Sequence, residues 1–464
     1  MASFLLKLTE NDTYAFYYNT PDAAAQAPMP AILARPAILI YKGDKMKYSK
    51  GITTSRRAGA LEARVKPEQY RKIREPLGSL YDAAAGVMSL FLKKACGLRV
   101  QTDGQVPQSG PVLVLCSHQG MLDFAVTAAA LLPRRLHFVC SESFFQRPLL
   151  APLLYAMGVI PKVQFTADPR CIASILRTLR AGGAVCLYPA GQTSMTGRPG
   201  EVGPAIARLV RKCGVSVAFL QLHGGFFTRS RFARGLNRGR IDARLGLLFA
   251  SGQPGALTDD EIYRRVCGAI DYDEYRWQRE TGAVFASRHR AKGYQNMLLL
   301  CPRCGARASY SARGNRVRCD VCGNSGAVGS DMRLHADEGS VLPETLVEWH
   351  DLLRRDWEKR LRAGSFCMKS PVRCRRWDGR RFAPDGGGVA TLDEHQLCYK
   401  PRCGEPVCLA NRTLSGMRCV PGAYFEIETP GGALRLYPDE GRSAAEWKLA
   451  QEYLHWRAGH ETTP

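Results

Sequence analysis

Short apolar runs alternate with amphipathic segments through the middle of the chain. The runs, each apolar enough for a strand buried on both faces, lie at 111–117, 136–142, 158–163, 184–190 and 214–222. Segments with apolar positions at helical spacing separate them, at 121–132, 149–157, 168–181 and 203–213. Because such alternation is typical of a parallel sheet with helices on both faces, we predict an α/β domain over 67–290 with a mainly parallel sheet covered by helices.

The segment before the first run predicts a long amphipathic helix over 67–97. Its apolar stripe runs from Ile73 to Ala95, and basic residues stand at its two ends: Arg71, Lys72, Arg74, Lys93 and Lys94. Asp82 interrupts the most apolar stretch, so no run reaches the roughly 18 apolar residues of a membrane-spanning helix. The helix is therefore expected to lie at a membrane surface or to cover the sheet.

The two ends of the chain differ from the middle. Residues 1–66 show no pattern that predicts a fold, and the opening MASFLLKLTENDTY lacks the pattern of a signal peptide. The segment 342–362 predicts a connector helix, and 363–464 a β-rich domain of short strands ending in a helix from Ser443 to Trp456. That order resembles a pleckstrin-homology or GRAM domain, with Trp447, Leu449 and Tyr453 as core residues.

Charge and cysteine content narrow the class of partner. The 65 Lys and Arg exceed the 42 Asp and Glu, a net charge of +23, which favours anionic lipid surfaces, phosphorylated ligands or nucleic acid. The segment 198–244 is especially basic. Most of the 17 cysteines stand singly in apolar runs and are expected to be free thiols in a reducing compartment. Cys403 and Cys408 lack a matching set of partners and are expected to be packing residues.

Two CxxC pairs predict a metal site. Cys301, Cys304, Cys319 and Cys322 each precede or follow a tight turn, and four thiolates suit tetrahedral zinc. The segment 298–325 therefore predicts a zinc ribbon with structural Zn²⁺. A role in contacting nucleic acid or protein through its arginines is the alternative.

A histidine and an aspartate follow the first apolar run. His118 and Asp123 are five positions apart, which separates them by roughly 140° on one helix. At a turn between a strand and a helix they can meet, and the carboxylate can then orient the imidazole as a general base. Capping of the following helix is the structural alternative.

The motifs around this pair resemble those of the glycerolipid acyltransferases of the lysophosphatidic-acid type, over roughly 68–250. The His-x4-Asp block is followed by Gly158–Lys162 and by Tyr188-Pro189-Ala190-Gly191-Gln192-Thr193-Ser194. The resemblance implies that His118 and Asp123 are catalytic. It implies that substrate contacts come from Lys162, Tyr188, Pro189, Gly191, Gln192, Thr193 and Ser194, with Arg198 as a substitute cation.

Four positions depart from the family pattern. Ala190 and Thr193 stand where the family has glutamate and arginine, Lys162 replaces an arginine, and Phe219 replaces a proline. The first three positions bind the glycerol phosphate of the acceptor in the family. Acyl transfer is therefore better supported than the identity of the acceptor.

The resemblance implies an enzyme of phospholipid biosynthesis. His118 would remove the proton from the hydroxyl of a lysophospholipid such as 1-acyl-glycerol-3-phosphate, and the oxygen would attack an acyl thioester of coenzyme A or acyl carrier protein. Such a protein would be cytoplasmic and peripheral to an anionic membrane surface, without a transmembrane helix. The alternatives are a non-catalytic lipid-binding or scaffold protein on the same fold and a nucleic-acid-binding zinc-ribbon protein; nucleic acid is not the partner that we expect.

Overall fold

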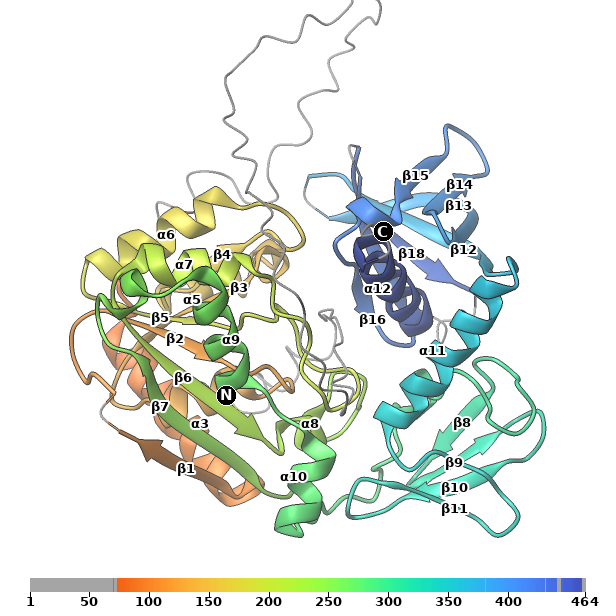
Figure 1. The fold of residues 1–464 in the computed structure, drawn as a ribbon, viewed down its shortest axis with the longest axis horizontal. Helices are drawn as coiled ribbons and strands as arrows, with labels where there is room; N and C mark the ends of the chain where they lie inside the picture. Colours follow the sequence, from red (N-terminus) through yellow and green to blue (C-terminus); the bar gives the residue numbers. More distant parts are fainter. Residues whose placement is uncertain are drawn as a thin grey trace, which may run out of the picture.

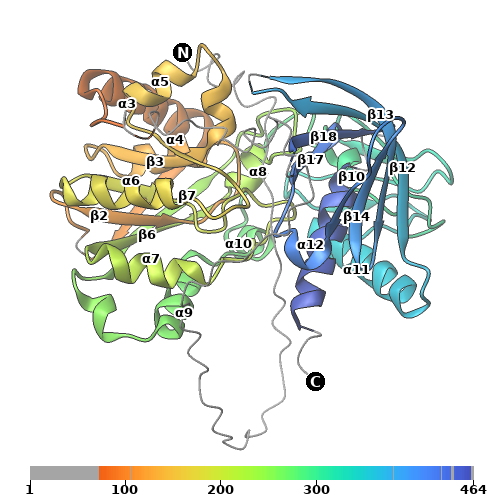
Figure 2. The ribbon, with the colours of Figure 1, turned by 90° about the horizontal axis from the view of Figure 1, so that it is seen from above.

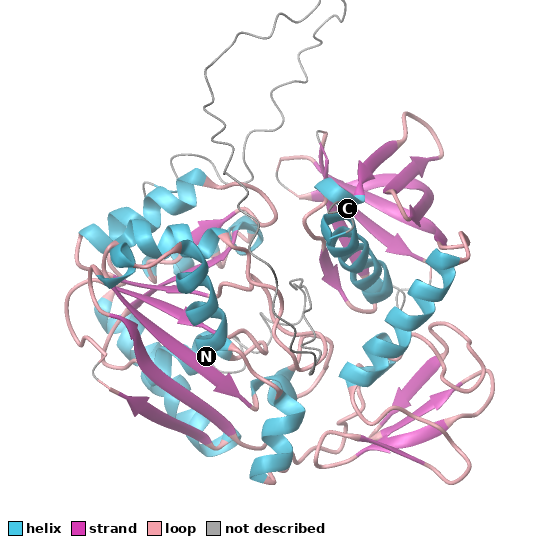
Figure 3. Ribbon diagram, viewed as in Figure 1, coloured by secondary structure: helices cyan, strands magenta, loops and turns pink. Residues whose placement is uncertain are grey.

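The protein folds around three β-sheets that follow one another along the chain (Figures 1 and 3). The computed structural model describes Tyr70 and residues 73–104, 106–379, 381–429, 431–439 and 444–460. The expectations for 1–66 and for Arg71 and Lys72 lie outside the described residues.

The first sheet has seven strands in the order β1-β7-β6-β2-β5-β3-β4. They are β1 Leu98–Asp103, β2 Val112–Cys116, β3 Leu136–Ser141, β4 Ile160–Lys162, β5 Ala184–Leu187, β6 Ser216–His223 and β7 Ile241–Phe249. The strands β4, β3, β5, β2 and β6 are parallel, whereas β7 is antiparallel to β6 and parallel to β1. The predicted mainly parallel α/β sheet is confirmed, and two strands that the sequence pattern did not indicate, β1 and β7, extend one edge.

Helices cover both faces of this sheet, as Figure 2 shows. The helices of this part are α3 Gly78–Cys96, α4 Asp123–Ala130, α5 Ala151–Ala156, α6 Pro169–Arg180, α7 Ala205–Cys213, α8 Gly225–Arg229, α9 Asp259–Ile270 and α10 Glu274–Thr281. Apolar residues of α3 and α4 pack on one face, and those of α6, α7 and α9 on the other. Every residue of β2 is buried, because β2 lies at the centre and has helices above and below.

The helix predicted over 67–97 is interrupted in the structure, where Tyr70 is helical. Residues 73–77 are not helical, and α3 begins at Gly78, two residues after Pro76. A proline disfavours helical backbone in the residue before it. The apolar periodicity of the sequence therefore extends across residues 73–77, whose backbone is not helical. One side of α3 is buried, including Tyr81, Met88 and Leu92, so this helix covers the sheet. Its opposite side carries exposed Val87 and Leu90.

The second sheet is antiparallel and small. Its strands are β8 Tyr310–Arg313, β9 Arg316–Cys319, β10 Ser325–Val328 and β11 Leu334–Ala336, in the order β11-β10-β9-β8. The helix α11, Leu346–Arg362, follows it and starts at a capping box between Thr345 and Glu348. Trp349 of α11 donates a hydrogen bond from Nε1 to the carbonyl of Leu300 at 3.1 Å, which ties the helix to the small sheet.

The third sheet and the last helix form a unit that we call the C-terminal unit, residues 367–460. The strands are β12 Cys367–Trp377, β13 Phe382–Asp393, β14 Gln396–Pro401, β15 Val407–Ala410, β16 Arg418–Val420, β17 Tyr424–Thr429 and β18 Gly432–Pro438. All are antiparallel, in the order β15-β14-β13-β12-β18-β17-β16, and α12, Ala444–His460, packs on them. Trp447 of α12 is buried and stacks on Phe425. Likeness to a pleckstrin-homology or GRAM domain stays a prediction.

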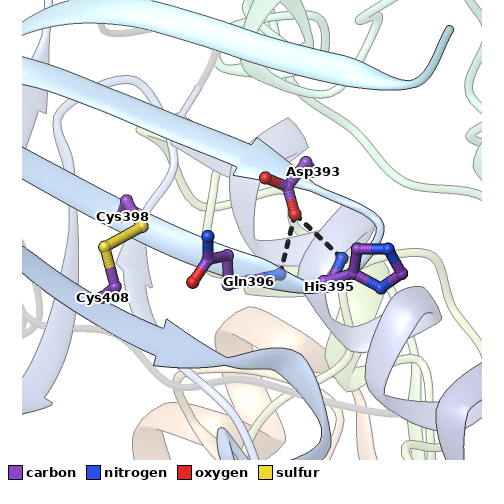
Figure 4. The surroundings of a disulfide bond; sticks show 5 residues. All are labelled: Asp393, His395, Gln396, Cys398 and Cys408. Atoms are coloured by element: carbon purple, nitrogen blue, oxygen red, sulfur yellow. Dashed lines mark hydrogen bonds between the residues drawn. A yellow bond between two sulfur atoms is a disulfide. The ribbon is translucent and has the colours of Figure 1, made fainter.

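Cys408, expected to be a packing residue, forms a disulfide. Cys398 of β14 and Cys408 of β15 are directly opposite each other in the sheet and are bonded at 2.09 Å (Figure 4). The backbone N–H groups of His395 and Gln396 donate to Asp393 in the preceding turn, also drawn in Figure 4. The sequence did not indicate this pair, because only the register of β14 against β15 brings the two sulfurs together.

A continuous apolar core joins the C-terminal unit to the rest of the protein. One buried cluster extends from Phe226 and Tyr275 near the first sheet, through Tyr310 and Trp349, to Trp447 in α12. Figures 1 and 2 show α12 on the side of the third sheet that faces the α/β part. None of the described helices combines the length and the apolar character needed to cross a bilayer.

Candidate active site

The turn between β2 and α4 brings His118 and Asp123 together. Nδ1 of His118 lies 2.7 Å from Oδ2 of Asp123, so the predicted contact is confirmed. A carboxylate can only accept, so Nδ1 carries the proton and donates it, and Nε2 of the neutral ring is left as an acceptor. The His118 side chain is 16% exposed and that of Asp123 is 1% exposed, which leaves the imidazole accessible and the carboxylate shielded.

Asp123 also holds the backbone of the turn. Its Oδ2 accepts hydrogen bonds from the backbone N–H groups of Gln119 at 2.5 Å and Gly120 at 3.0 Å. Asp123 is the first residue of α4, where the helix dipole favours a negative charge. One oxygen of Asp123 thus contacts both the imidazole and the backbone of the turn before α4. No described side chain caps the N-terminus of α4, so helix capping does not account for this aspartate.

Further contacts position both the ring and the backbone of His118. The ring of Tyr188 stacks on it with centroids 4.3 Å apart, and the backbone carbonyl of His118 accepts from the hydroxyl of Tyr272 at 2.9 Å and from the N–H of Ser194 at 3.1 Å. Tyr188 and Ser194 come from the second motif block. The blocks that the sequence separates by about 70 residues are therefore in contact.

Sequence reasoning missed a buried polar network under the turn. The side-chain amide of Gln119 donates to Glu274 at 2.9 Å, and its oxygen accepts from the N–H of Gly225 at 3.0 Å. Burial raises the pKa of Glu274, although hydrogen bonds from His223, Gly224 and Gln119 oppose that rise. Gln119 and Glu274 are 155 residues apart. Gln119 stands at a variable position of the His-x4-Asp block, and Glu274 stands in no motif, so the sequence did not mark the pair.

A cavity of about 1000 Å³ opens beside His118. Much of its wall is apolar and comes from helices on both faces of the sheet, with Met88, Phe124, Leu153, Ile172 and Leu209 among the lining residues. Pockets of this size are typical of small-molecule sites, and an apolar wall suits an aliphatic chain. The imidazole therefore lies where an apolar ligand can reach it.

Six of the predicted substrate contacts line this cavity: Lys162, Tyr188, Pro189, Gly191, Gln192 and Thr193. Oε1 of Gln192 and Oγ1 of Thr193 are buried without a hydrogen-bond partner among the described residues. Buried polar atoms normally have a partner, so these two are suited to a ligand. Gly191 has a positive φ of 71°, which favours glycine there.

The structure places two other predicted contacts elsewhere. Oγ of Ser194 is buried and donates to the carbonyl of Arg198 at 2.7 Å, and Arg198 pairs with Asp273 at 2.7 Å. Neither residue lines the cavity, so they shape the loop behind it. Nζ of Lys162 donates to the carbonyls of Val163 and Thr166.

Two arginines of the basic segment 198–244 are in ion pairs. Arg211 pairs with Asp259, and Arg244 pairs with Asp103. The aromatic residues Phe226, Phe227 and Phe232 of this segment are buried in the core. These three residues therefore do not supply the exposed aromatics on which the bases of a single strand stack.

The four predicted cysteine ligands meet at one end of the small sheet. The sulfurs of Cys301, Cys304, Cys319 and Cys322 all lie within 4.8 Å of one another, so the cluster could hold a metal ion. Burial raises the pKa of Cys301, but hydrogen bonds from Tyr310 and the backbone outweigh that effect and lower the pKa to about 6. Cysteine binds metal as the thiolate.

Comparison with known proteins agrees with this geometry. Residues 97–219, which include β2, the His118 turn and the second block, match the family model described as Acyltransferase. Within the chain, 112 residues are 21% identical to 1-acyl-sn-glycerol-3-phosphate acyltransferase of Bacillus subtilis (strain 168), over 24% of this chain and 56% of that protein. The chain thus spans little more than half of this relative's length.

A solved structure also shows likeness. It is the 1-acyl-sn-glycerophosphate acyltransferase PlsC from Thermotoga maritima, with 15% identity, a TM-score of 0.36 and coverage of 47% of this chain and 88% of that one. The family model and the curated relative support a relationship between the α/β part and the lysophosphatidic-acid acyltransferases.

Proposed function

We propose that the protein transfers a fatty acyl group from an acyl thioester to the hydroxyl of a lysophospholipid. The observation that carries this proposal is the His118–Asp123 pair, 2.7 Å apart, beside a largely apolar cavity of about 1000 Å³. The match of residues 97–219 to the Acyltransferase family supports it.

The reaction needs one base and one set of oxyanion donors. Nε2 of His118 removes the proton of the acceptor hydroxyl, and the oxygen attacks the carbonyl carbon of the thioester. The tetrahedral oxyanion then collapses, the carbon–sulfur bond breaks, and the imidazolium returns the proton to the leaving thiolate. Asp123 stabilises the imidazolium and keeps Nδ1 protonated. The products are an ester and a free thiol of coenzyme A or acyl carrier protein.

The oxyanion donors are assigned to backbone N–H groups of the cavity wall. The loop 190–193 and the start of α7 at Gly203 to Ile206 both line the cavity. The N-terminus of a helix favours negative charge, and backbone donors aimed at a developing charge lower the barrier to the reaction.

The acceptor is proposed to be 1-acyl-glycerol-3-phosphate or a related lysophospholipid, the substrate class named by the Bacillus subtilis relative. Ala190 and Thr193 line the cavity where the family has charged side chains, so contacts to the headgroup must differ from the family pattern. Buried Gln192 and Thr193 supply polar atoms without partners among the described residues.

The cysteine cluster is proposed to hold a structural zinc ion. Four sulfurs within 4.8 Å match the donor set that zinc prefers. A metal there would cross-link the two CxxC turns of a sheet whose strands have only three or four residues. It plays no part in the acyl transfer.

The protein is proposed to meet its lipid substrate at a membrane surface. Leu77, Val87 and Leu90 in and next to α3 and Phe124 in α4 are 56%, 52%, 55% and 39% exposed, and α3 ends with Lys93 and Lys94. Exposed apolar residues with neighbouring basic ones suit a surface that contacts anionic lipid.

The test is an acyl-transfer assay with His118→Ala. Purified protein is offered acyl-coenzyme A or acyl carrier protein thioester with a panel of lysophospholipids, and thiol release and product ester are both measured. We expect His118→Ala to abolish transfer without changing thermal unfolding, whereas the matched variant His395→Ala, in an exposed turn of the C-terminal unit, keeps wild-type rates. Wild-type turnover in His118→Ala would refute the mechanism. Lipid binding by the wild type without turnover would favour the non-catalytic alternative.

A further inference from the structure

The C-terminal unit contributes part of the wall of the cavity beside His118. Ser415, His455, Trp456 and Gly459 line the same cavity as the motif residues. They lie outside residues 97–219, where the family match ends. Three of the four belong to the last turns of α12, which Figures 1 and 2 show on the side of the third sheet that faces the α/β part.

A buried ion network fixes this unit against the α/β part. Arg418 of β16 pairs with Glu142, which follows β3, and with Glu426 of β17 at 3.0 Å. The side chains of Arg418, Glu142 and Glu426 are 7%, 0% and 1% exposed. Removing such charges from water costs several kcal/mol unless they are paired in good geometry, so the network favours one docked position of the unit.

The same network reaches the second motif block. Nε of Arg418 donates to Oε1 of Gln164 at 3.0 Å, and Nε2 of Gln164 donates to the carbonyl of Gly191 at 3.2 Å. Oγ of Ser415 donates to the carbonyl of Phe165 at 3.3 Å. Gln164, Phe165 and Gly191 all line the cavity, so the C-terminal unit is joined to the wall nearest the motif loop.

The lining residues of the C-terminal unit differ in chemistry from those of α3, α4 and α5. The residues from α3, α4 and α5 are aliphatic or aromatic, as Met88, Phe124 and Leu153 are, and suit an acyl chain. The C-terminal wall offers the indole of Trp456 and the imidazole of His455. Nδ1 of His455 contacts the carbonyl of Asn411 at 2.8 Å, which fixes the orientation of the ring.

We propose that the C-terminal unit forms the acceptor side of the lipid site, and that His455 and Trp456 determine which lysolipid headgroups are accepted. The proposal rests on the acyltransferase function proposed above and names the part of the chain that selects its acceptor. An indole and an imidazole in the cavity wall suit the boundary between a glyceryl ester and a hydroxylated polar headgroup, because both rings combine an apolar body with a polar atom. Neither residue takes part in the proton transfer.

The first test measures lysolipid binding without turnover. A lysophospholipid with a bromine-labelled acyl chain near the glycerol is titrated into the full chain, and tryptophan fluorescence is recorded. We expect quenching in the wild type and in Trp377→Phe, whose tryptophan ends β12 and does not line the cavity. Trp456→Phe should lose the saturable part of the quenching. Equal quenching in both variants would overturn the proposal.

The second test measures steady-state transfer with varied acceptor. Leucine at Gly459 would project into a space in which a Cβ meets no described heavy atom within 4 Å. Gly459→Leu and Trp456→Ala should raise the KM for the preferred acceptor about tenfold and leave the KM for the thioester unchanged. Gly268→Leu is the matched control, since Gly268 is also a helical glycine with open space around it, on α9 and away from the cavity.

The outcomes distinguish a failure of this proposal from a failure of the proposed acyltransferase function. If the wild type transfers no acyl group to any lysophospholipid, the proposed function fails. If the wild type is active and both variants keep the wild-type KM and the same ranking of acceptors, the function stands and the acceptor role of the C-terminal unit is wrong. Thermal unfolding of each variant identifies a loss that comes from misfolding, and Trp456→Phe in the binding test then decides the case.

Discussion

The buried arginine between the C-terminal unit and the α/β part offers a prediction that is independent of the reaction. Arg418→Met removes the guanidinium but keeps much of the volume of the side chain. Glu426 keeps an ion pair with Arg435 at 2.8 Å, so the loss falls mainly on Glu142, which is 0% exposed, and on Gln164.

The expected cost follows from burial. Burial alone would lower the pKa of Arg418, but Glu142 and Glu426 outweigh it and raise the pKa above its ordinary value. Removing one member of a buried ion pair leaves an uncompensated charge and costs about 3–5 kcal/mol. The double variant Arg418→Met with Glu142→Gln should recover most of this loss, because the remaining charge is neutralised.

Urea unfolding of the full chain at neutral pH, followed by tryptophan fluorescence, measures the free energy of unfolding of each variant. Trp447 in the core of the C-terminal unit reports its unfolding. Arg381→Met is the control, because the Arg381–Asp378 pair is exposed and such pairs contribute about 0–1 kcal/mol. Equal urea midpoints for Arg418→Met and Arg381→Met would show that the buried network does not hold the unit in solution.

Three further predictions concern the catalytic pair, the cysteine cluster and the surface of α3. Asp123→Asn should lower kcat about 10³- to 10⁴-fold with little change in the acceptor KM, by weakening stabilisation of the imidazolium; a kcat within tenfold of wild type contradicts this. Metal analysis of protein purified without added zinc should find one zinc per chain, and Cys304→Ser should lose it and unfold at a lower temperature; metal-free wild type ends the zinc proposal. Val87→Asp with Leu90→Asp should weaken sedimentation with anionic vesicles, which high salt should partly reverse in the wild type; unchanged binding places the attachment elsewhere.

The features that the sequence determined are local. Apolar runs with intervening helical periodicity indicated the parallel core of the first sheet, because each strand buried on both faces must be apolar throughout. His118 and Asp123 are separated by one turn, and the two cysteines of each CxxC pair by two residues. In both cases the conformation of a few residues of backbone is enough to bring the side chains together. Pro76 shows the limit of periodicity: the pattern predicts helix from 67, but α3 begins at Gly78.

The tertiary structure decided the contacts between distant segments. Gln119 meets Glu274, and Arg418 meets Glu142, only after the sheets have packed, and neither pair has a spacing or motif that marks it. Cys398 faces Cys408 because of the register between β14 and β15. The end of α12 reaches the cavity because one continuous core holds the C-terminal unit beside the α/β part. Spacing along the sequence determines contacts between residues that are a few positions apart. Contacts between distant segments depend on how the buried surfaces of the sheets and helices pack together.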